Sequence, residues 1–369
     1  MSDIRYWIGF NRVMGIGPAK LRALRDHFGD LEAAWHARSA DLREAGLDKR
    51  ALEYLLAARA AMDLDAEVAK VARLGARVVT WDDDEYPAQL KSIANPPPLL
   101  YVKGEFATAD QWAIAVVGTR RATAYGREVT QTLVADLVRN RVTIVSGLAR
   151  GIDATAHQAA LDAGGRTIAV LGHGIDYIYP PEHRKLAERI VEHGALATDY
   201  SVGTPPEGSN FPPRNRIISG LSLGVLVVEG DSSSGAHITA DFAAEQGRDV
   251  FAVPGNILNR SSRLPNKLIQ QGATPVLCAE DILEPLNLTM VAQHVEAREA
   301  IPADETEANL LAMLSAEPVH IDDLQREIGL PISQVSSTLA MMELKGMVRQ
   351  VGGMNYVVAR EQGATYKVD

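Results

Sequence analysis

The chain has 369 residues, a formal net charge of −10 and one cysteine, which favours two or three domains and excludes both a disulfide framework and a cysteine-rich zinc site. Hydrophobic residues make up 46% and charged residues 23% of the chain, as in soluble globular proteins. Because no apolar run is long enough to span a membrane and Met1 to Gly17 lacks a signal-peptide pattern, we expect a cytoplasmic protein that does not enter a membrane.

Residues 1–75 predict a helical domain of the helix–hairpin–helix or SAM-like kind. An amphipathic segment from Asp3 to Val13 is followed by a tight turn in which Pro18 stands near the first position of the next helix. The Gly-x-Gly amides of such a hairpin can hold a DNA phosphate, with Lys20 nearby. The same pattern also fits a plain corner between two helices, and the residue types leave both interpretations open.

Residues 76–111 predict the approach to a large sheet. Arg77 to Trp81 is typical of a short strand, and a stiff spacer of three prolines leads into a second strand, Leu99 to Val102. Between the two strands lies the acidic segment Asp82 to Glu85. Its spacing fits neither a calcium loop nor a catalytic pair of carboxylates, so we interpret it as a solvated turn.

Residues 112–288 predict the core of an α/β domain that begins at about residue 76. Continuous apolar strands alternate with helices, which indicates a Rossmann-like, doubly wound, mostly parallel sheet buried on both faces. Right-handed crossovers place the turn after each strand at the carboxyl edge, where such folds bind ligands. These turns are Gly118–Arg121, Ser146–Arg150, Gly172–Gly174, Ser232–Gly235 and Pro254–Gly255.

Small residues before a helix present backbone N–H groups to an anion, so the carboxyl edge is predicted to bind phosphate. Arg150 adds a fixed cation to one of the turns. Asp153 stands where the cap of the next helix belongs, and capping is its expected role. Farther along the chain, Asn266 and Lys267 are expected in the first turn of another helix, which favours anions in the same way.

The segment Asp199 to Arg216 is rich in glycine, proline and serine, which predicts a long loop over this edge. It brings Phe211, Arg214 and Arg216 into one region. Arginine for phosphate and an aromatic ring for a base make up the composition of a single-strand groove. The alternative is that Phe211 is buried under the loop and that the arginines pair with nearby acids.

The C-terminal part predicts a linker, residues 289–305, and a winged helix, residues 306–369, because three helices precede a Gly-Gly hairpin. Residues 289–369 contain 6 Lys and Arg against 12 Asp and Glu. Lys345 and Arg349 are the cations expected on the third helix and the wing. We therefore predict a protein-docking or regulatory module that does not bind duplex DNA, with Met341, Met342 and Met347 either in its core or exposed to a partner.

Together these segments resemble the DprA/Smf family, the bacterial DNA-processing proteins of natural transformation. The resemblance rests on SGLARGIDATAH, GHGIDYIYPPEHR, NFPPRNRIISGLS, GVLVVEG, SGAHITADFAAEQGRDVFAVPG and NKLIQQGA, in that order. It covers residues 112–286 and extends more loosely to the preceding segment and the winged helix. The chain departs from the family pattern at Thr119, where serine is common, and at Leu264-Pro265, where smaller residues are frequent.

The resemblance implies single-stranded DNA binding largely independent of sequence, protection of the strand and its transfer to the RecA recombinase. It also implies a homodimer formed through the Rossmann-like domain, with no catalysis, cofactor or metal. The positions expected to line the DNA groove are Gly118, Thr119, Arg120, Ser146, Gly147, Arg150, Phe211, Arg214, Asn215, Arg216, Ser234, Gly235 and Lys267.

The alternative function is a Rossmann-like nucleotide enzyme of the phosphoribohydrolase type. The stretch SSSGAHITADFA lacks the Gly-Gly-x-Gly-Thr loop and the following Glu of that class. Glu229 ends a strand at the ligand edge, but the sequence shows no partner for it as a base. His157, four residues after Asp153, is expected to be a satisfied structural group, as is His173. We therefore predict a DNA-binding protein without catalytic residues.

Overall fold

The computed structural model describes residues 3–232, 234–288, 305–314, 318–344, 348–351 and 353–358. The chain forms two compact units, Met1–Leu286 and Asn287–Asp369. Among the described residues, no helix combines the length and the apolar character needed to cross a membrane.

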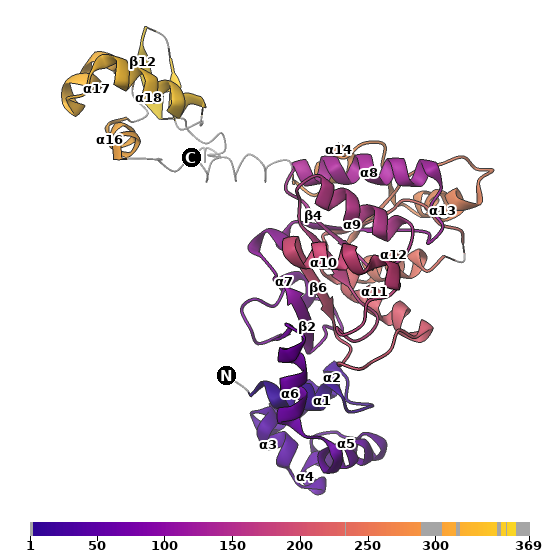
Figure 1. Cartoon of the computed structure of the whole chain (residues 1–369). Helices are drawn as coiled ribbons and strands as arrows, with labels where there is room; N and C mark the ends of the chain where they lie inside the picture. The colour runs from indigo at the N-terminus through magenta and orange to yellow at the C-terminus, as the bar shows by residue number, and fades with distance from the viewer. Residues whose placement is uncertain are drawn as a thin grey trace, which may run out of the picture. The chain divides into compact units, whose positions relative to one another are not determined.

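Six helices lie within residues 3–75, at one end of the first unit (Figure 1). They are α1 (Ile4–Asn11), α2 (Pro18–Phe28), α3 (Leu31–His36), α4 (Ser39–Glu44), α5 (Lys49–Ala61) and α6 (Leu64–Arg73). An aspartate side chain accepts a hydrogen bond from the first turn of four of them, as helix N-caps do. Phe10 and Trp35 pack edge to face, with ring centroids 5.1 Å apart. The helical prediction is confirmed.

The turn between α1 and α2 has no free lysine to offer a phosphate. The Lys20 ammonium donates to the Gly15 carbonyl at 2.9 Å and forms an ion pair with Asp48. These contacts tie the turn to α5, and they favour the plain corner over the DNA-binding hairpin.

The described residues include one nine-stranded sheet with the order β1-β2-β6-β5-β4-β3-β7-β8-β9. The strands from β6 to β9 in this order are parallel, whereas β2 pairs antiparallel with both β1 and β6. The strands are β1 (Arg77–Thr80), β2 (Leu99–Gly104), β3 (Ala113–Val117), β4 (Thr143–Ser146), β5 (Thr167–Val170), β6 (Gly194–Thr198), β7 (Gly224–Val227), β8 (Asp249–Ala252) and β9 (Thr274–Pro275). The predicted doubly wound sheet is confirmed, and its approach segment adds β1 and β2.

Helices cover both faces of the sheet (Figure 1). They are α7 (Ala88–Lys91), α8 (Ala124–Arg139), α9 (Ile152–Asp162), α10 (Arg184–His193), α11 (Phe211–Gly220), α12 (Ala236–Glu245), α13 (Arg263–Gln270) and α14 (Glu280–Leu283). Helices α8 to α10 connect strands from β3 towards β6, whereas α12 and α13 connect strands from β7 towards β9. Right-handed crossovers therefore place the two sets on opposite faces, and the direction changes between β3 and β7.

Two predicted segments differ from the structure. The loop prediction is wrong from Phe211 onward, because α11 begins there and two prolines occupy its first turn, where no intrahelical N–H donor is needed. Lys267 is not in the first turn of its helix either, since α13 already begins at Arg263. Both errors come from treating proline as a loop residue.

The side chain of Asn11 connects the N-terminal helices to the segment before α11, as does the Arg12 side chain, which donates to the Val202 carbonyl at 3.0 Å. The amide nitrogen of Asn11 donates to the Asp199 carbonyl at 3.1 Å. Its amide oxygen accepts from the Tyr101 hydroxyl at 3.2 Å and from the Ser201 hydroxyl at 2.7 Å. Asn11 therefore joins α1, β2 and the end of β6.

The acidic turn after β1 is held by hydrogen bonds and ion pairs. Asp83 accepts from the Thr80 backbone N–H at 2.7 Å, and Asp82 pairs with Arg25 at 2.6 Å. Within the described residues, no three His, Cys, Asp or Glu side chains are placed to hold a metal ion.

The second unit is a winged helix. Its described elements are α16 (Glu305–Met313), β10 (Val319–His320), α17 (Ile321–Ile328), α18 (Ile332–Leu344), β11 (Val348–Gln350) and β12 (Asn355–Val358), with the strand order β10-β12-β11. Met342 is fully buried in the core of this unit, whereas Met341 is exposed. The predictions for Lys345 and Met347 lie outside the described residues.

Candidate nucleic-acid interface

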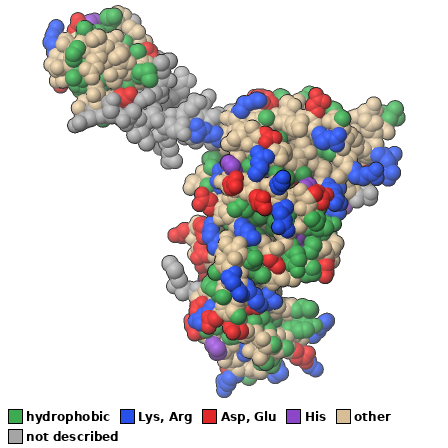
Figure 2. All heavy atoms as spheres, viewed as in Figure 1, with side chains coloured by type: hydrophobic (Ala, Val, Ile, Leu, Met, Phe, Trp, Pro, Cys, Tyr) green, Lys and Arg blue, Asp and Glu red, His purple; other side chains and the backbone are tan. Residues whose placement is uncertain are grey.

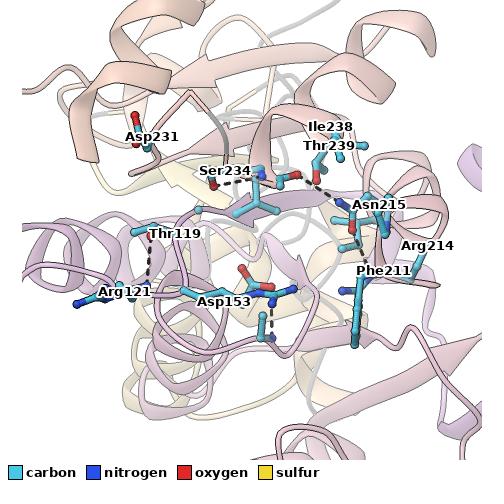
Figure 3. Close-up of a pocket in the computed structure, with 18 of the residues that line it drawn as sticks. Thr119, Arg121, Asp153, Phe211, Arg214, Asn215, Asp231, Ser234, Ile238 and Thr239 are labelled. Carbon is cyan, nitrogen blue, oxygen red and sulfur yellow. Dashed lines mark hydrogen bonds between the residues drawn. The ribbon is translucent and has the colours of Figure 1, made fainter. Parts of the chain in front are cut away.

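A pocket of about 480 Å³ opens at the carboxyl edge, where the winding direction changes between β3 and β7 (Figure 3). The turns after β3, β4 and β7 line it, together with the start of α11. Of the predicted site residues, those on its wall are Gly118, Thr119, Arg120, Phe211, Arg214, Asn215, Ser234 and Gly235. The structure therefore brings together eight positions that span more than a hundred residues of sequence.

Three helices, α9, α11 and α12, begin beside this pocket, so their N-termini face the same space. The turns that lead to them pack closely. Gly151 has a φ of +79°, and a Cβ there would lie 2.2 Å from the Thr119 carbonyl oxygen. The Thr119 N–H donates to the Glu229 carbonyl at 2.7 Å, which fixes the turn after β3 to the end of β7. These contacts fix the turns after β3 and β4 to each other and to the end of β7, and the helix dipoles at the site favour an anion.

Arginine and phenylalanine meet on the pocket wall. The guanidinium carbons of Arg120 and Arg214 lie 5.6 and 5.8 Å from the centroid of the Phe211 ring, within cation–π range. Arg120 is exposed and available to a phosphate, whereas Phe211 is half-buried. In Figure 3 the turn that carries Thr119 and Arg121 lies across the pocket from Phe211.

Arg214 is a buried residue of the pocket wall, and the Asp153 carboxylate lies near its guanidinium, on the other side of Gly147. Arg214 Nη1 donates to the Gly147 carbonyl at 3.0 Å, and the Gly147 N–H donates to Asp153 at 3.1 Å. Burial lowers the pKa of Arg214 to about 10, although the Asp153 carboxylate opposes that shift. Burial also raises the pKa of Asp153. This buried pair orders the turn after β4.

The structure corrects the predicted role of Asp153. The residue before α9 is Gly151, and the Asp153 side chain accepts from Gly147 and Ala149 rather than from the first turn of its own helix. The carboxylate therefore caps the preceding turn instead of the helix.

Two predicted groove residues do not reach the pocket. Ser146 is fully buried, and its hydroxyl donates to the Val116 carbonyl at 2.6 Å, because it is the last residue of β4 in the centre of the sheet. Arg216 pairs with Asp199 at 2.6 Å, away from the pocket wall. The ion-pair alternative therefore holds for Arg216 in this structure, and its role as a DNA contact stays a prediction.

Gly147, Arg150 and Lys267 lie outside the pocket wall. Gly147 packs against Arg214 and Asp153, which leaves no room for a side chain. Arg150 is exposed and pairs with Glu182 at 2.6 Å. Lys267 is exposed on α13. Arg150 and Lys267 stay predicted contacts for a strand that extends beyond the pocket.

Arg121, which we did not predict as a contact, also lines the pocket. Its N–H donates to the Thr119 hydroxyl at 3.2 Å, which completes the turn after β3. The signal was present in the sequence, since Arg121 directly follows Arg120 in a turn at the ligand edge.

The candidate catalytic groups have structural partners. The Glu229 carboxylate accepts from the N–H of Thr123 at 2.9 Å and from its hydroxyl at 2.6 Å, at the start of α8. His157 bonds to Thr167 at 2.6 Å rather than to Asp153. Burial lowers the pKa of His173, which bonds to the Gly174 carbonyl. These contacts account for all three groups without a reaction.

Comparison with known proteins covers both units. A family model described as DNA recombination-mediator protein A matches residues 77–287, and one described as the DprA winged helix domain matches residues 294–354. Protein Smf of Synechocystis sp. is 35% identical over 392 aligned positions, which cover 96% of this chain and 98% of that protein.

Two solved structures are similar. The X-ray structure of DNA processing protein A from Streptococcus pneumoniae is 34% identical with a TM-score of 0.68, and the match covers 77% of this chain and 98% of that chain. DNA processing protein A from Helicobacter pylori is 28% identical with a TM-score of 0.51, and the match covers 57% of this chain and 95% of that one. The Helicobacter structure is described as showing a single-stranded DNA binding mode.

Proposed function

Since the chain belongs to the DNA recombination-mediator protein A (DprA) family, we propose that it binds single-stranded DNA at the pocket between β3 and β7, largely independent of sequence. Proteins of this family process DNA and are not known as enzymes. The observation that carries the proposal is the meeting of exposed Arg120, the Phe211 ring and three helix N-termini at one site. Cations, amides and an aromatic wall bind the backbone and the faces of bases without reading their edges.

The resemblance to the family implies two protein partners, the RecA recombinase and a second copy of the chain. We propose that the bound strand is protected and passed to the RecA recombinase, and that two copies of the chain pair through the Rossmann-like domain. We also propose residues 1–75, 76–288, 289–305 and 306–369 as the functional divisions of the chain.

The mixed surface charge fits a local rather than a global attraction to DNA. Figure 2 shows Lys and Arg side chains interspersed with Asp and Glu over the visible face of the first unit. Such a surface has no strong single-sign field, so the salt dependence of binding should come from the few cations at the site.

Replacing Arg120 and Arg121 together with alanine should weaken binding of a single-stranded oligonucleotide and lower the slope of log K against log salt by about one unit per lost phosphate contact. The reason is that both side chains line the pocket and neither lies in the sheet core. Fluorescence anisotropy in a salt titration measures both quantities, with duplex DNA and mononucleotides as competing ligands.

Arg139→Ala is the matched control, because Arg139 is an exposed cation in the last turn of α8, at the opposite edge of the sheet. It should leave affinity and salt slope at the parent values. Parent-like binding by the Arg120/Arg121 double variant would place the DNA site elsewhere.

The isolated segment 305–369 should not retard duplex DNA in a mobility-shift assay at low salt. Helix α18 contains no Lys or Arg, while Asp322, Asp323 and Glu327 are exposed on α17. A phosphate backbone approaching this surface would be repelled. The segment has its own hydrophobic core, so it can be tested alone. Tight, salt-sensitive duplex binding by this segment would contradict the prediction of a protein-docking or regulatory module.

A further inference from the structure

We propose that Tyr179 is a second stacking platform for single-stranded nucleic acid, placed outside the pocket so that the strand leaves it across Tyr179 towards Arg150. The inference rests on the proposed function and extends it to a residue that the sequence did not single out. Its ligand is one unpaired base of a strand whose neighbouring nucleotide occupies the pocket.

The aromatic wall of the pocket is already partly covered by protein. Arg120 and Arg214 lie over the Phe211 ring, and a Cβ at Gly172 would come within 2.7 Å of its Cδ1 atom. Gly172 therefore packs directly against the ring. A base that stacks on Phe211 must share it with these groups, so sequence-tolerant stacking calls for another open ring beside the pocket.

Tyr179 offers that ring. It is 39% exposed, and its centroid lies 5.9 Å from that of Phe211, with a tilt of 33° between the planes. It does not line the pocket, whereas Phe211 does. The two rings therefore form a continuous aromatic surface that begins inside the pocket and ends in solvent.

The segment that carries Tyr179 is held by hydrogen bonds on both sides of this residue. The Gly174 N–H donates to the Thr204 carbonyl at 2.9 Å, and His183 Nδ1 bonds to the Leu148 carbonyl at 2.9 Å. The second bond joins the short helix after Tyr179 to the turn after β4. A stacking ring held in place in this way loses little freedom when a base binds.

Cations lie on both sides of the ring pair. Arg120 contacts Phe211, and Arg150 pairs at 2.6 Å with Glu182, which lies three residues after Tyr179. The side chains of Arg150 and Glu182 are 57% and 50% exposed, so a phosphate can compete for the guanidinium at little cost. Two rings for base faces and two arginines for phosphates make up the proposed path.

The test compares Tyr179→Ala with Tyr179→Phe in the full chain, with an oligo-dT of about 20 nucleotides as the probe. Loss of one stacking ring should weaken binding by about 5- to 150-fold, because stacking contributes about 1–3 kcal/mol per base. The salt slope should stay at the parent value, since tyrosine carries no charge. The phenylalanine variant should bind like the parent, because it keeps the ring and removes the hydroxyl.

Tyr54→Ala is the matched control, since the side chain of Tyr54 has a similar exposed fraction. Tyr54 lies on α5, in the N-terminal helical region, and does not line the pocket. Tyr179→Trp supplies a direct readout, because a base stacked on the new indole should quench its emission when oligo-dT is added. Parent-like affinity of Tyr179→Ala, or an unquenched indole at saturating oligo-dT, would overturn the inference. The inference would also be overturned if Tyr179→Ala lost affinity and its melting temperature fell by more than that of Tyr54→Ala. The loss of affinity would then come from damage to the fold.

The outcomes separate this inference from the function on which it rests. If the Arg120/Arg121 double variant loses affinity and Tyr179→Ala does not, the pocket binds DNA and Tyr179 is not a platform. If the parent chain itself fails to bind oligo-dT, the proposed function fails.

Discussion

Replacing Asp153 with alanine should lower the free energy of unfolding by about 3–5 kcal/mol, as expected when one partner of a buried charge pair is removed. Arg214 is buried in the pocket wall, and Asp153 is the carboxylate that most opposes the effect of burial on its pKa. The substitution also removes the acceptor for the Gly147 N–H. Equilibrium unfolding in urea measures the loss.

Two further variants separate the effect of the Asp153 charge from the effect of its hydrogen bond, and the effect of a buried carboxylate from that of an exposed one. Asp153→Asn keeps an acceptor oxygen and removes the charge, so it should cost less than alanine while still destabilising the fold. Asp162→Ala removes an exposed partner of Arg189 and should change stability by no more than about 1 kcal/mol. Equal stabilities for Asp153→Ala and Asp162→Ala would show that the buried pair does not stabilise the turn.

His157 should make the protein lose stability as the pH falls below 6.5. It is fully buried, and its Nε2 atom has no hydrogen-bond partner among the described residues. The Thr167 hydroxyl donates to the Ile144 carbonyl, so His157 Nδ1 must donate to Thr167, which leaves Nε2 unprotonated. Burial lowers the pKa of His157 to about 3.

Proton binding by the unfolded chain sets the direction in which stability changes with pH. Between pH 6.5 and 3 the unfolded chain binds a proton at this histidine and the folded chain does not, so stability rises with pH across this window. The slope from this group is about 1.4 kcal/mol per pH unit, which amounts to about 3 kcal/mol by pH 4. Unfolding free energies measured from pH 7 to 4 should show this slope in the parent and lose it in His157→Gln. An unchanged slope in the variant would assign it to other groups.

The sheet was predictable because its strands are visible in the sequence. Ala113–Val117 and Thr143–Ser146 are apolar runs that end at glycine, and the structure ends the strands there. Strand β6 was missed, because GALAT has no run of β-branched residues. It forms in the interior of the sheet, between β5 and β2, where pairing on both sides outweighs weak local propensity.

The place of the pocket at the carboxyl edge was also predictable, but the direction of the side chains around it was not. In a loop, Arg214 and Arg216 would be equivalent. On a helix, residues two apart point about 200° apart around the axis. Arg214 therefore lies on the pocket wall, whereas Arg216 lies beside Asp199. A helix start rich in proline conceals this distinction in the sequence.

Asn11 links the N-terminal helices to the helix that begins at the pocket. Its side chain holds the Asp199 carbonyl, and the Asp199 carboxylate in turn holds Arg216 on α11. The helix that carries Phe211 is thus linked to an asparagine two hundred residues upstream. A chimaera that takes its helical region from a relative without this asparagine should therefore lose the link, although every residue on the pocket wall stays the same.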